Sequence, residues 1–293
     1  MEAHGAVQNS PLHSGTTNTQ MFNNNRYTLC PVPGLLEQGQ PLDQKFQGSG
    51  GRIFIAPYDD ELCIVKIPNN NDISRVDDEV SVMLDEELRE QPIAELKAAH
   101  LWPTDFEVKE IAFVFKFYKG GDLMTLLQQA PERRDPRLNG PSLELDFIVL
   151  FVVQRLCLAL ATLHRMGWAH CDIKPENIFC PSADYFGLKA CVLGDFGGLK
   201  RIGIDYVHPN QTGTRNWVPW KDGCKLAEGN FDMFSVGRIM AAFSQAFGPL
   251  SPDVSALAKE LMARKACDRP SASDLLEQRL PDLFERLKQL SMQ

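Results

Sequence analysis

The 293-residue sequence predicts an α+β fold made of two unequal parts, a small strand-rich part followed by a larger, mainly helical part. Up to about residue 119, short runs of β-branched and aromatic residues alternate with turn residues, which is the pattern of antiparallel strands. From about residue 145, apolar residues recur with helical spacing over long stretches. A chain of this length buries enough apolar surface to form two lobes.

The strand-rich part is expected over residues 42–119, after a leader formed by residues 1–41. Residues 1–25 contain Glu2 as their only charged side chain apart from histidines, and such a polar composition favours disorder. Proline and glycine punctuate the next stretch and indicate a linker. Strands are expected at 46–56, 61–67 and 110–118, with a turn at 57–60 and an acidic helix at 74–89.

The mainly helical part is expected over residues 120–293. A hinge between the two parts is expected near 116–120, and a Gly-Gly-Asp turn then precedes a helix that begins at Leu123. Further helices are expected at 146–166, 231–247, 255–264 and 273–290.

Composition and charge argue against several classes of protein. The net charge is −8, so a broad phosphate-binding surface for nucleic acid is not expected. The most apolar stretch, 147–163, is interrupted by Gln154 and Arg155, so a buried helix is expected there rather than a transmembrane span of about 20 apolar residues. The eight cysteines form no C-x-x-C pair, and no secretory signal is visible, so reduced thiols and a cytoplasmic location are expected.

The most informative segment is His170-Cys171-Asp172-Ile173-Lys174-Pro175-Glu176-Asn177, which Asp195-Phe196-Gly197 follows 18 residues later. It offers a carboxylate base, a lysine two residues on and an asparagine five residues on. Phosphoryl transfer from a magnesium nucleotide requires these groups. In this order and spacing the two segments resemble the H-R-D-x-K-x-x-N catalytic loop and the D-F-G motif of the protein kinase family, with Cys171 in place of arginine.

The resemblance covers about residues 42–290 and implies the two-lobed protein kinase fold, with a β-rich N-terminal lobe and a mainly helical C-terminal lobe. Residues 212–219 are similar to the substrate-facing segment G-T-x-x-Y-x-A-P-E of the family. Residues 232–237 match D-x-W-S-x-G, whose aspartate braces the catalytic loop, and residues 267–272 match the late D-x-R-P-[ST] motif.

The resemblance implies a role for each polar residue of the site. Asp172 is expected to orient the substrate hydroxyl as the base, and Lys174 to neutralise the moving phosphoryl group. Thr214 is expected to form hydrogen bonds near both of them. Asn177 and Asp195 are expected to bind Mg²⁺, a hard cation that prefers oxygen ligands. ATP and Mg²⁺ are therefore the expected cofactors.

A nucleotide site is expected between the two lobes. Glycines let backbone amides approach phosphates closely, and the strand at 64–67 resembles the one that carries the phosphate-binding lysine of the family, here Lys66. Phe115 is similar in position to the gatekeeper. The other expected contacts are the glycine loop Gly48, Ser49, Gly50 and Gly51, the hinge backbone at Lys116 and Tyr118, and the apolar residues Ile55, Ile64 and Phe179 around the adenine.

Lys66 needs a carboxylate partner, because an unpaired lysine that faces inward from an apolar strand is costly. Glu79 is expected to be this partner, since Met83 follows it at the spacing that the family shows. Glu86 and Glu87 belong to the same acidic segment and fit the spacing about as well.

Residues 72–95 concentrate nearly the whole net charge, with nine acidic residues against Arg75 and Arg89. A solvated face is the ordinary explanation for such a segment. Docking of a basic regulatory partner that controls the helix is the alternative.

Two departures from the family pattern affect regulation and docking. Cys171 replaces the arginine that grips a phosphorylated activation segment, so activity is expected not to depend on a phosphate there. Only 36 residues separate Asp232 from Arg269, fewer than the three helices of the family need. The helix that docks substrates and regulators is therefore expected to be shortened or missing.

A third departure concerns Trp220, which stands where a glutamate ordinarily pairs with the arginine now at 269. An unpaired buried guanidinium would cost about 3–5 kcal/mol, so Arg269 needs another partner. Asp222 and Glu228 are near in the sequence and are the expected candidates.

The sequence therefore predicts a Mg-ATP-dependent protein serine/threonine kinase that transfers the γ-phosphoryl group of ATP to a protein hydroxyl. Lysine at position 174 is typical of the Ser/Thr-specific branch of the family. A nucleotide-binding pseudokinase scaffold and a small-molecule kinase are the alternatives. The polar leader and the trimmed helical part also resemble kinases that bacteria secrete into host cells, so the host cytoplasm is a further predicted location.

Overall fold

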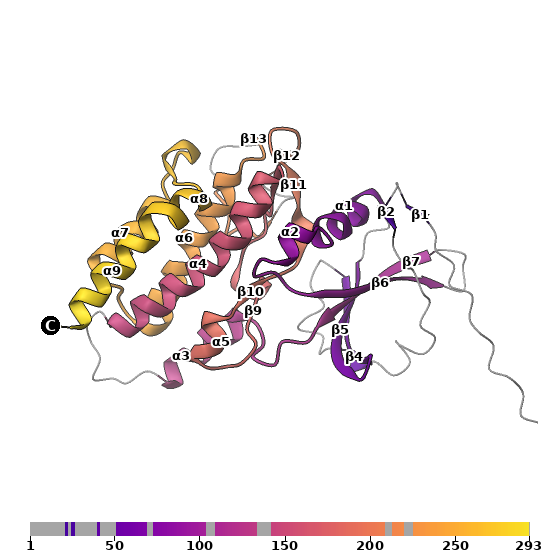
Figure 1. Ribbon diagram of the computed structural model, residues 1–293, viewed down its shortest axis with the longest axis horizontal. Helices are drawn as coiled ribbons and strands as arrows, with labels where there is room; N and C mark the ends of the chain where they lie inside the picture. The colour runs from indigo at the N-terminus through magenta and orange to yellow at the C-terminus, as the bar shows by residue number, and fades with distance from the viewer. Residues whose placement is uncertain are drawn as a thin grey trace, which may run out of the picture.

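The structure is a computed structural model that describes residues 21–22, 25–26, 40–41, 51–68, 73–103, 109–133, 142–208, 213–219 and 225–292. A sheet with two short helices forms one end of the molecule, and a bundle of longer helices forms the other (Figure 1). The predicted α+β fold, with strands first and helices second, is confirmed. Most of the predicted leader lies outside the described residues.

The N-terminal sheet has the strand order β3-β4-β5-β7-β6, and every neighbouring pair is antiparallel. β4 continues two residues beyond the predicted strand, so the turn to β5 shrinks to Asp59 and Asp60, whose φ angles are 47° and 62°. Aspartate tolerates this left-handed conformation better than most residues. The strands are β3 (Gln40–Pro41), β4 (Gly51–Tyr58), β5 (Glu61–Pro68), β6 (Leu96–Pro103) and β7 (Lys109–Lys116).

The strand register decides which side chains share a face of this sheet. Lys66 lies opposite Phe113, and Ile64 lies opposite both Ile55 and Phe115. Because side chains alternate along a strand, these residues belong to one face, and Phe113 and Phe115 join the main core of the protein. The other face is lined by the buried side chains of Ala56, Cys63, Val65, Ile67, Ala112 and Val114.

The single acidic helix predicted at 74–89 is wrong, because the structure contains two helices there, α1 (Ile73–Met83) and α2 (Glu86–Arg89). Asp85 separates them. Its carboxylate accepts hydrogen bonds from the second and third amides of α2, at 3.0 and 3.2 Å, and so caps a new helix. Buried Val80 attaches α1 to the main core.

Short antiparallel strand pairs, none of them predicted, tie the loops together. Their strands have two residues each, too few to leave an alternating pattern in the sequence. The pairs are β1 (Met21–Phe22) with β2 (Asn25–Arg26), β8 (Trp168–Ala169) with β11 (Lys200–Arg201), β9 (Ile178–Phe179) with β10 (Val192–Leu193), and β12 (Tyr206–Val207) with β13 (Lys225–Leu226).

The chain passes from the sheet to the helical part between Lys116 and Leu123. The described helices of this part are α3 (Leu123–Arg133), α4 (Leu143–Arg165), α5 (Tyr185–Lys189), α6 (Gly229–Phe247), α7 (Pro252–Leu261), α8 (Ala272–Asp274) and α9 (Leu280–Ser291). α4 and α6 pack against each other at the centre, with α7 and α9 beside them (Figure 1).

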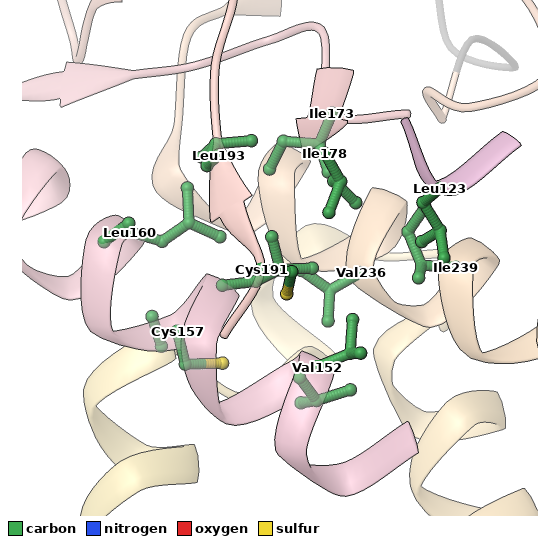
Figure 2. Close-up of a cluster of buried hydrophobic side chains, with 14 of the residues drawn as sticks. Leu123, Val152, Cys157, Leu160, Ile173, Ile178, Cys191, Leu193, Val236 and Ile239 are labelled. Atoms are coloured by element: carbon green, nitrogen blue, oxygen red, sulfur yellow. The ribbon is translucent and has the colours of Figure 1, made fainter. Parts of the chain in front are cut away.

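The helical core explains the apolar character of α4. By length and composition this helix is suited to cross a membrane, yet 12 of its 23 residues are buried in the protein. Figure 2 shows side chains of α3, α4, α6 and the strand pair β9–β10 meeting in one cluster. The predicted buried helix is therefore confirmed.

The C-terminal helix predicted at 273–290 contains a wide turn. A π-helical turn over Leu275–Arg279 joins α8 to α9, directly ahead of Pro281. Proline has no N–H to donate, and its ring clashes with the carbonyl four residues earlier, so a regular α-helix is disfavoured here. The extra residue of the π turn moves that carbonyl aside and lets the helix continue.

Two α-helices, α6 and α7, span the region from Asp232 to Arg269, within the stretch 225–292 that is described without a gap. Residues 248–251 alone connect them. The shortened region predicted from the spacing is confirmed.

We expect Asp146→Asn to stabilise the protein near neutral pH. Asp146 is fully buried at the start of α4, and one carboxylate oxygen accepts a hydrogen bond from the Ser251 amide (3.1 Å). Burial raises the pKa of this carboxyl, so the folded state binds the proton more tightly than the unfolded chain. The stability that protonation supplies is present at low pH and is lost as the pH rises through the folded-state pKa.

An amide at position 146 removes this cost, and a gain of about 1 kcal/mol would raise the Tm by about 2–4 °C in a protein of this size. Thermal unfolding followed by circular dichroism measures the effect, which should shrink as the pH is lowered through the folded-state pKa of Asp146. A variant less stable than the wild type at neutral pH would contradict the prediction.

Candidate active site

The catalytic loop, residues 170–177, runs from β8 to β9 and ends in a 3-10 turn at Pro175–Asn177. Its centre is the Asp172 carboxylate, which accepts hydrogen bonds from Lys174 Nζ (2.8 Å) and from the Thr214 hydroxyl (2.9 Å). Lys174 Nζ also donates to Thr214 Oγ1 (3.0 Å). The structure thus brings together the predicted base, cation and hydroxyl, although Thr214 lies 42 residues beyond Asp172.

Asn177 belongs to the same group and is buried. Its amide nitrogen donates to the Asp172 carbonyl (2.8 Å) and to Asp172 Oδ2 (3.2 Å), so its amide oxygen remains for a cation. Asn177 and Asp195 therefore offer one neutral and one charged oxygen. These hard donors fit Mg²⁺, which completes its shell with water and phosphate oxygens.

Asp195 follows β10 in a left-handed backbone conformation, with φ 59°. Such a conformation costs about 1–3 kcal/mol and persists only where the surroundings impose it. His170 supplies part of these surroundings, because its ring lies 5.0 Å from the Phe196 ring and its Nε2 lies 3.2 Å from the Gly194 carbonyl oxygen. The catalytic loop and Asp195 are therefore held in a fixed relation.

Lys66 joins the sheet to Asp195 and to α1. Its Nζ lies 2.5 Å from Asp195 Oδ1 and 3.6 Å from Glu79 Oε1, and the side chains of Lys66 and Glu79 are both buried. The carboxylate partner on the acidic segment is therefore Glu79.

The alternative partners, Glu86 and Glu87, lie on α2 and are exposed. Glu87 forms an ion pair with Arg165 of α4, which ties α2 to the helical part instead of to Lys66. Docking of a basic partner on residues 72–95 stays a prediction.

Lys66, Glu79 and Asp195 alter one another's pKa. Burial alone would lower the pKa of Lys66, but the carboxylates of Asp195 and Glu79 raise it above its ordinary value. Burial raises the pKa of Glu79 against the pull of Lys66. Burial would also raise the pKa of Asp195, but the charge and hydrogen bond of Lys66 lower it to about 2. Lys66 and Asp195 are therefore both charged at physiological pH.

Asp232 of α6 fixes the backbone of the catalytic loop, as the resemblance implies. It is fully buried, and its two oxygens accept hydrogen bonds from the amides of His170 and Cys171, both at 2.8 Å. His164 Nε2 lies 2.8 Å from the same carboxylate. These bonds offset the strain of Cys171, whose φ is 62°. Burial and the nearby Asp232 charge raise the pKa of the Cys171 thiol well above its usual value, so this side chain is neutral.

Phe179, expected beneath the adenine, stacks on Tyr118 with ring centroids 6.1 Å apart and an interplanar angle of 14°. A Cβ at Gly194 would lie 2.6 Å from the Phe179 ring, so the glycine before Asp195 makes room for this ring. Gly194 was not predicted to be a site residue, although its position directly before Asp195 was a signal that could have identified it.

The hinge backbone at Lys116 and Tyr118 is partly engaged within the protein. The Lys116 amide donates to the Glu95 carbonyl (3.0 Å), and the Tyr118 carbonyl accepts a hydrogen bond from the Gly121 amide (3.0 Å). The Tyr118 hydroxyl accepts another from the Glu95 amide (3.1 Å). Glu95 therefore clamps the hinge, a role that no sequence pattern indicated.

Gly51 begins β4 with φ 139°, and a Cβ there would lie 2.2 Å from the Ile67 carbonyl oxygen. This position accepts only glycine. The binding of phosphates by the glycine loop stays a prediction, because the structure does not describe Gly48, Ser49 and Gly50. Trp220 also lies outside the described residues.

Arg269 is buried, and its guanidinium lies 5.1 Å from the Phe234 ring. Of the carboxylates suggested by the sequence, Glu228 is exposed and Asp222 lies outside the described residues. The guanidinium donates to the main-chain carbonyls of Ala263 (2.8 Å), Asn230 (2.9 Å) and Arg264 (3.3 Å). Among the described residues, carbonyl oxygens therefore surround this charge, and its pairing with Asp222 stays a prediction.

Comparison with known proteins agrees with this geometry. Mouse serine/threonine-protein kinase D3 is 30% identical over 150 residues, which are 50% of this chain and 16% of the relative. Rat serine/threonine-protein kinase D2 is 30% identical over 152 residues, with the same shares. Human serine/threonine-protein kinase MRCK gamma is 25% identical over 216 residues, 61% of this chain and 13% of its own length.

The chain therefore spans less than a fifth of the length of these relatives. The family model described as the protein kinase domain matches residues 47–256, which is more than half of the sequence. Strands β4 to β7, helices α1 to α6 and the site residues from Lys66 to Thr214 lie in this range, and the chain belongs to the protein kinase family.

Proposed function

We propose that the protein is a Mg-ATP-dependent protein serine/threonine kinase, which transfers the γ-phosphoryl group of ATP to a hydroxyl of a protein substrate. The observation that carries the proposal is the Asp172 carboxylate, bonded to Lys174 and Thr214 at 2.8 and 2.9 Å. A base and a cation that converge on one point suit transfer to a hydroxyl. The matched relatives, all serine/threonine-protein kinases by name, support this acceptor.

Asp172, Lys174 and Thr214 have separate roles in the proposed reaction. Asp172 accepts the hydrogen of the substrate hydroxyl and so orients its oxygen. Lys174 supplies positive charge where negative charge develops during transfer. Thr214 holds both side chains in place through its two hydrogen bonds.

Bound Mg-ATP supplies the phosphoryl group, and the metal neutralises the charge of the phosphates. Asp195 and Asn177 would hold this metal, since both present oxygen donors beside the loop. Lys66, kept charged and oriented by Glu79, would bind the phosphates.

The test is transfer of radiolabelled phosphate from ATP by the purified protein to generic protein substrates, beside its Asp172→Ala variant. We expect label on serine and threonine with the wild type and background label with the variant. Label found only on small-molecule acceptors would indicate the small-molecule kinase. Nucleotide binding without transfer would indicate the pseudokinase scaffold, and either result would reject the proposal.

We expect full activity without a phosphate between Asp195 and Pro219. In the family the catalytic-loop arginine binds such a phosphate through charge-assisted hydrogen bonds. Cys171 is a buried, neutral thiol and offers no such grip. The measurement is the initial rate of protein co-expressed with a phosphatase, its unmodified mass confirmed. An enzyme that stays inactive until this segment is modified would refute the prediction.

A further inference from the structure

The segment after Asp195 contains a turn that closes on Asp205. β11 pairs with β8 beside the catalytic loop, and β12 pairs with β13 just ahead of α6. Between β11 and β12, Asp205 Oδ2 accepts a hydrogen bond from the Arg201 amide (2.7 Å) and lies 3.6 Å from Arg201 Nε. The Asp205 amide donates back to the Arg201 carbonyl (3.0 Å). The carboxylate thus caps its own turn.

Asp205 also connects this turn to the strand ahead of α6. Its carbonyl accepts a hydrogen bond from the Ala227 amide (2.8 Å), and the Gly203 amide donates to the Ala227 carbonyl (2.9 Å). Gly203 has φ 73°, which glycine adopts without strain. One residue therefore closes the turn and extends the pairing of β12 with β13, a two-stranded unit called here the activation ribbon.

The activation ribbon contacts the catalytic loop at Cys171. Val207 of the ribbon and Cys171 are buried in one small apolar cluster. The Cys171 carbonyl oxygen lies so close to Gly213 that a Cβ there would be only 2.4 Å away. Cys171 precedes Asp172 and Gly213 precedes Thr214, so the residues beside this contact form the 2.9 Å hydrogen bond of the site.

We propose that Asp205 is a positioning residue, whose carboxylate keeps the activation ribbon ordered and thereby sets the contact between Asp172 and Thr214 without a phosphate. The proposal rests on the kinase function proposed above. A neutral thiol at Cys171 cannot recruit an anion, whereas Asp205 supplies within the segment an acceptor for the Arg201 amide.

Two substitutions separate the hydrogen bond of Asp205 from its charge. Asp205→Asn keeps an acceptor oxygen for the Arg201 amide and removes only the charge, which contributes little in a partly exposed pair. Asp205→Ala removes both. We expect Asp205→Ala to lower kcat/KM for a protein substrate by about tenfold or more, since small displacements of catalytic groups have large effects. Asp205→Asn should retain about half of the wild-type value or more.

Further readouts distinguish positioning from a general loss of structure. The KM for ATP should change by less than about twofold in both variants, because Lys66 and Asp195 keep their own contacts. Amide hydrogen exchange over residues 201–207 should become faster in Asp205→Ala and stay slow in Asp205→Asn. Asp253→Ala is the matched control, since this exposed aspartate pairs with Arg286 at 3.5 Å in the C-terminal helices.

An Asp205→Ala enzyme with wild-type kcat/KM would overturn the inference. A parallel loss of ATP binding and thermal stability would overturn it as well, because it would show a merely structural role. If the wild type transfers no phosphate, the proposed function fails, and hydrogen exchange then decides on Asp205 alone. Unchanged hydrogen exchange over residues 201–207 in Asp205→Ala would reject the ordering role. Faster exchange that is confined to residues 201–207 in this variant would support that role.

Discussion

Asp195→Asn is expected to lower phosphoryl transfer by at least about 10²–10³-fold while the protein stays folded, because a charge aimed at the reacting phosphates is lost. The Asp195 carboxylate is charged at physiological pH, since its pKa is about 2. Asparagine has the same shape but carries no charge for a cation. Calorimetric titration with ATP, with and without Mg²⁺, should show that the magnesium dependence of binding is lost.

Asp172→Ala is the informative comparison for this variant. It should lose transfer equally, yet keep magnesium-dependent binding, because Asn177 still donates to the main-chain carbonyl of residue 172 and Asp195 keeps its contact with Lys66. Asp253→Asn, an exposed substitution, should behave as the wild type. Nucleotide binding that keeps its magnesium dependence in Asp195→Asn would show that this residue is not the metal ligand.

Glu79→Gln is expected to lower kcat/KM by about 10–100-fold, or about 1.4–2.7 kcal/mol of transition-state stabilisation. Glu79 is buried and lies 3.6 Å from Lys66 Nζ, so the amide removes one of the two carboxyl groups that hold this lysine. The low dielectric of a buried site makes that loss large. Steady-state kinetics with a protein substrate measure it.

The controls are Glu86→Gln and Glu87→Gln, which should stay within about twofold of the wild type because exposed acidic residues contribute little. Among the described residues, Glu87 forms an ion pair with Arg165, an exposed arginine of α4. Equal mild effects from all three substitutions would contradict the special role of Glu79.

The catalytic loop could be predicted because its chemistry is local in the sequence. Asp172, Lys174 and Asn177 lie within six residues, and a short loop places such residues together whatever the rest of the fold does. Thr214 needed the family resemblance, since nothing in its own surroundings shows that it reaches Asp172.

The errors in the fold occur where tertiary contacts decide the structure. β6 contains Ala, His and Lys without clear alternation, and it is a strand because β7 pairs with it. The break between α1 and α2 had a local signal, Asp85, but the strong acidic helical pattern around it concealed the cap.

Tertiary contacts made by main-chain groups could not be predicted from the residue types. Arg269 donates to carbonyl oxygens, which every residue has, so no residue type in the sequence marks these contacts. Glu95 holds the hinge through its main-chain N–H and carbonyl as well as through the ion pair of its side chain with Lys116 (3.4 Å), and no residue type marks the main-chain contacts. Asp205 was likewise invisible, because its effect depends on how β12 meets β13.

The surroundings of Cys171 make the loss of the family arginine difficult to reverse in evolution. Cys171 is 3% exposed, and Val207, Ala227 and Phe231 fill the cluster around it. A Cys171→Arg mutation would place a guanidinium among these apolar side chains, at a cost of about 3–5 kcal/mol for an unpaired buried charge. A lineage that carries this cluster could regain the arginine only after smaller neighbours had opened the space. Restoring the arginine would therefore require changes at several positions of the cluster rather than at Cys171 alone.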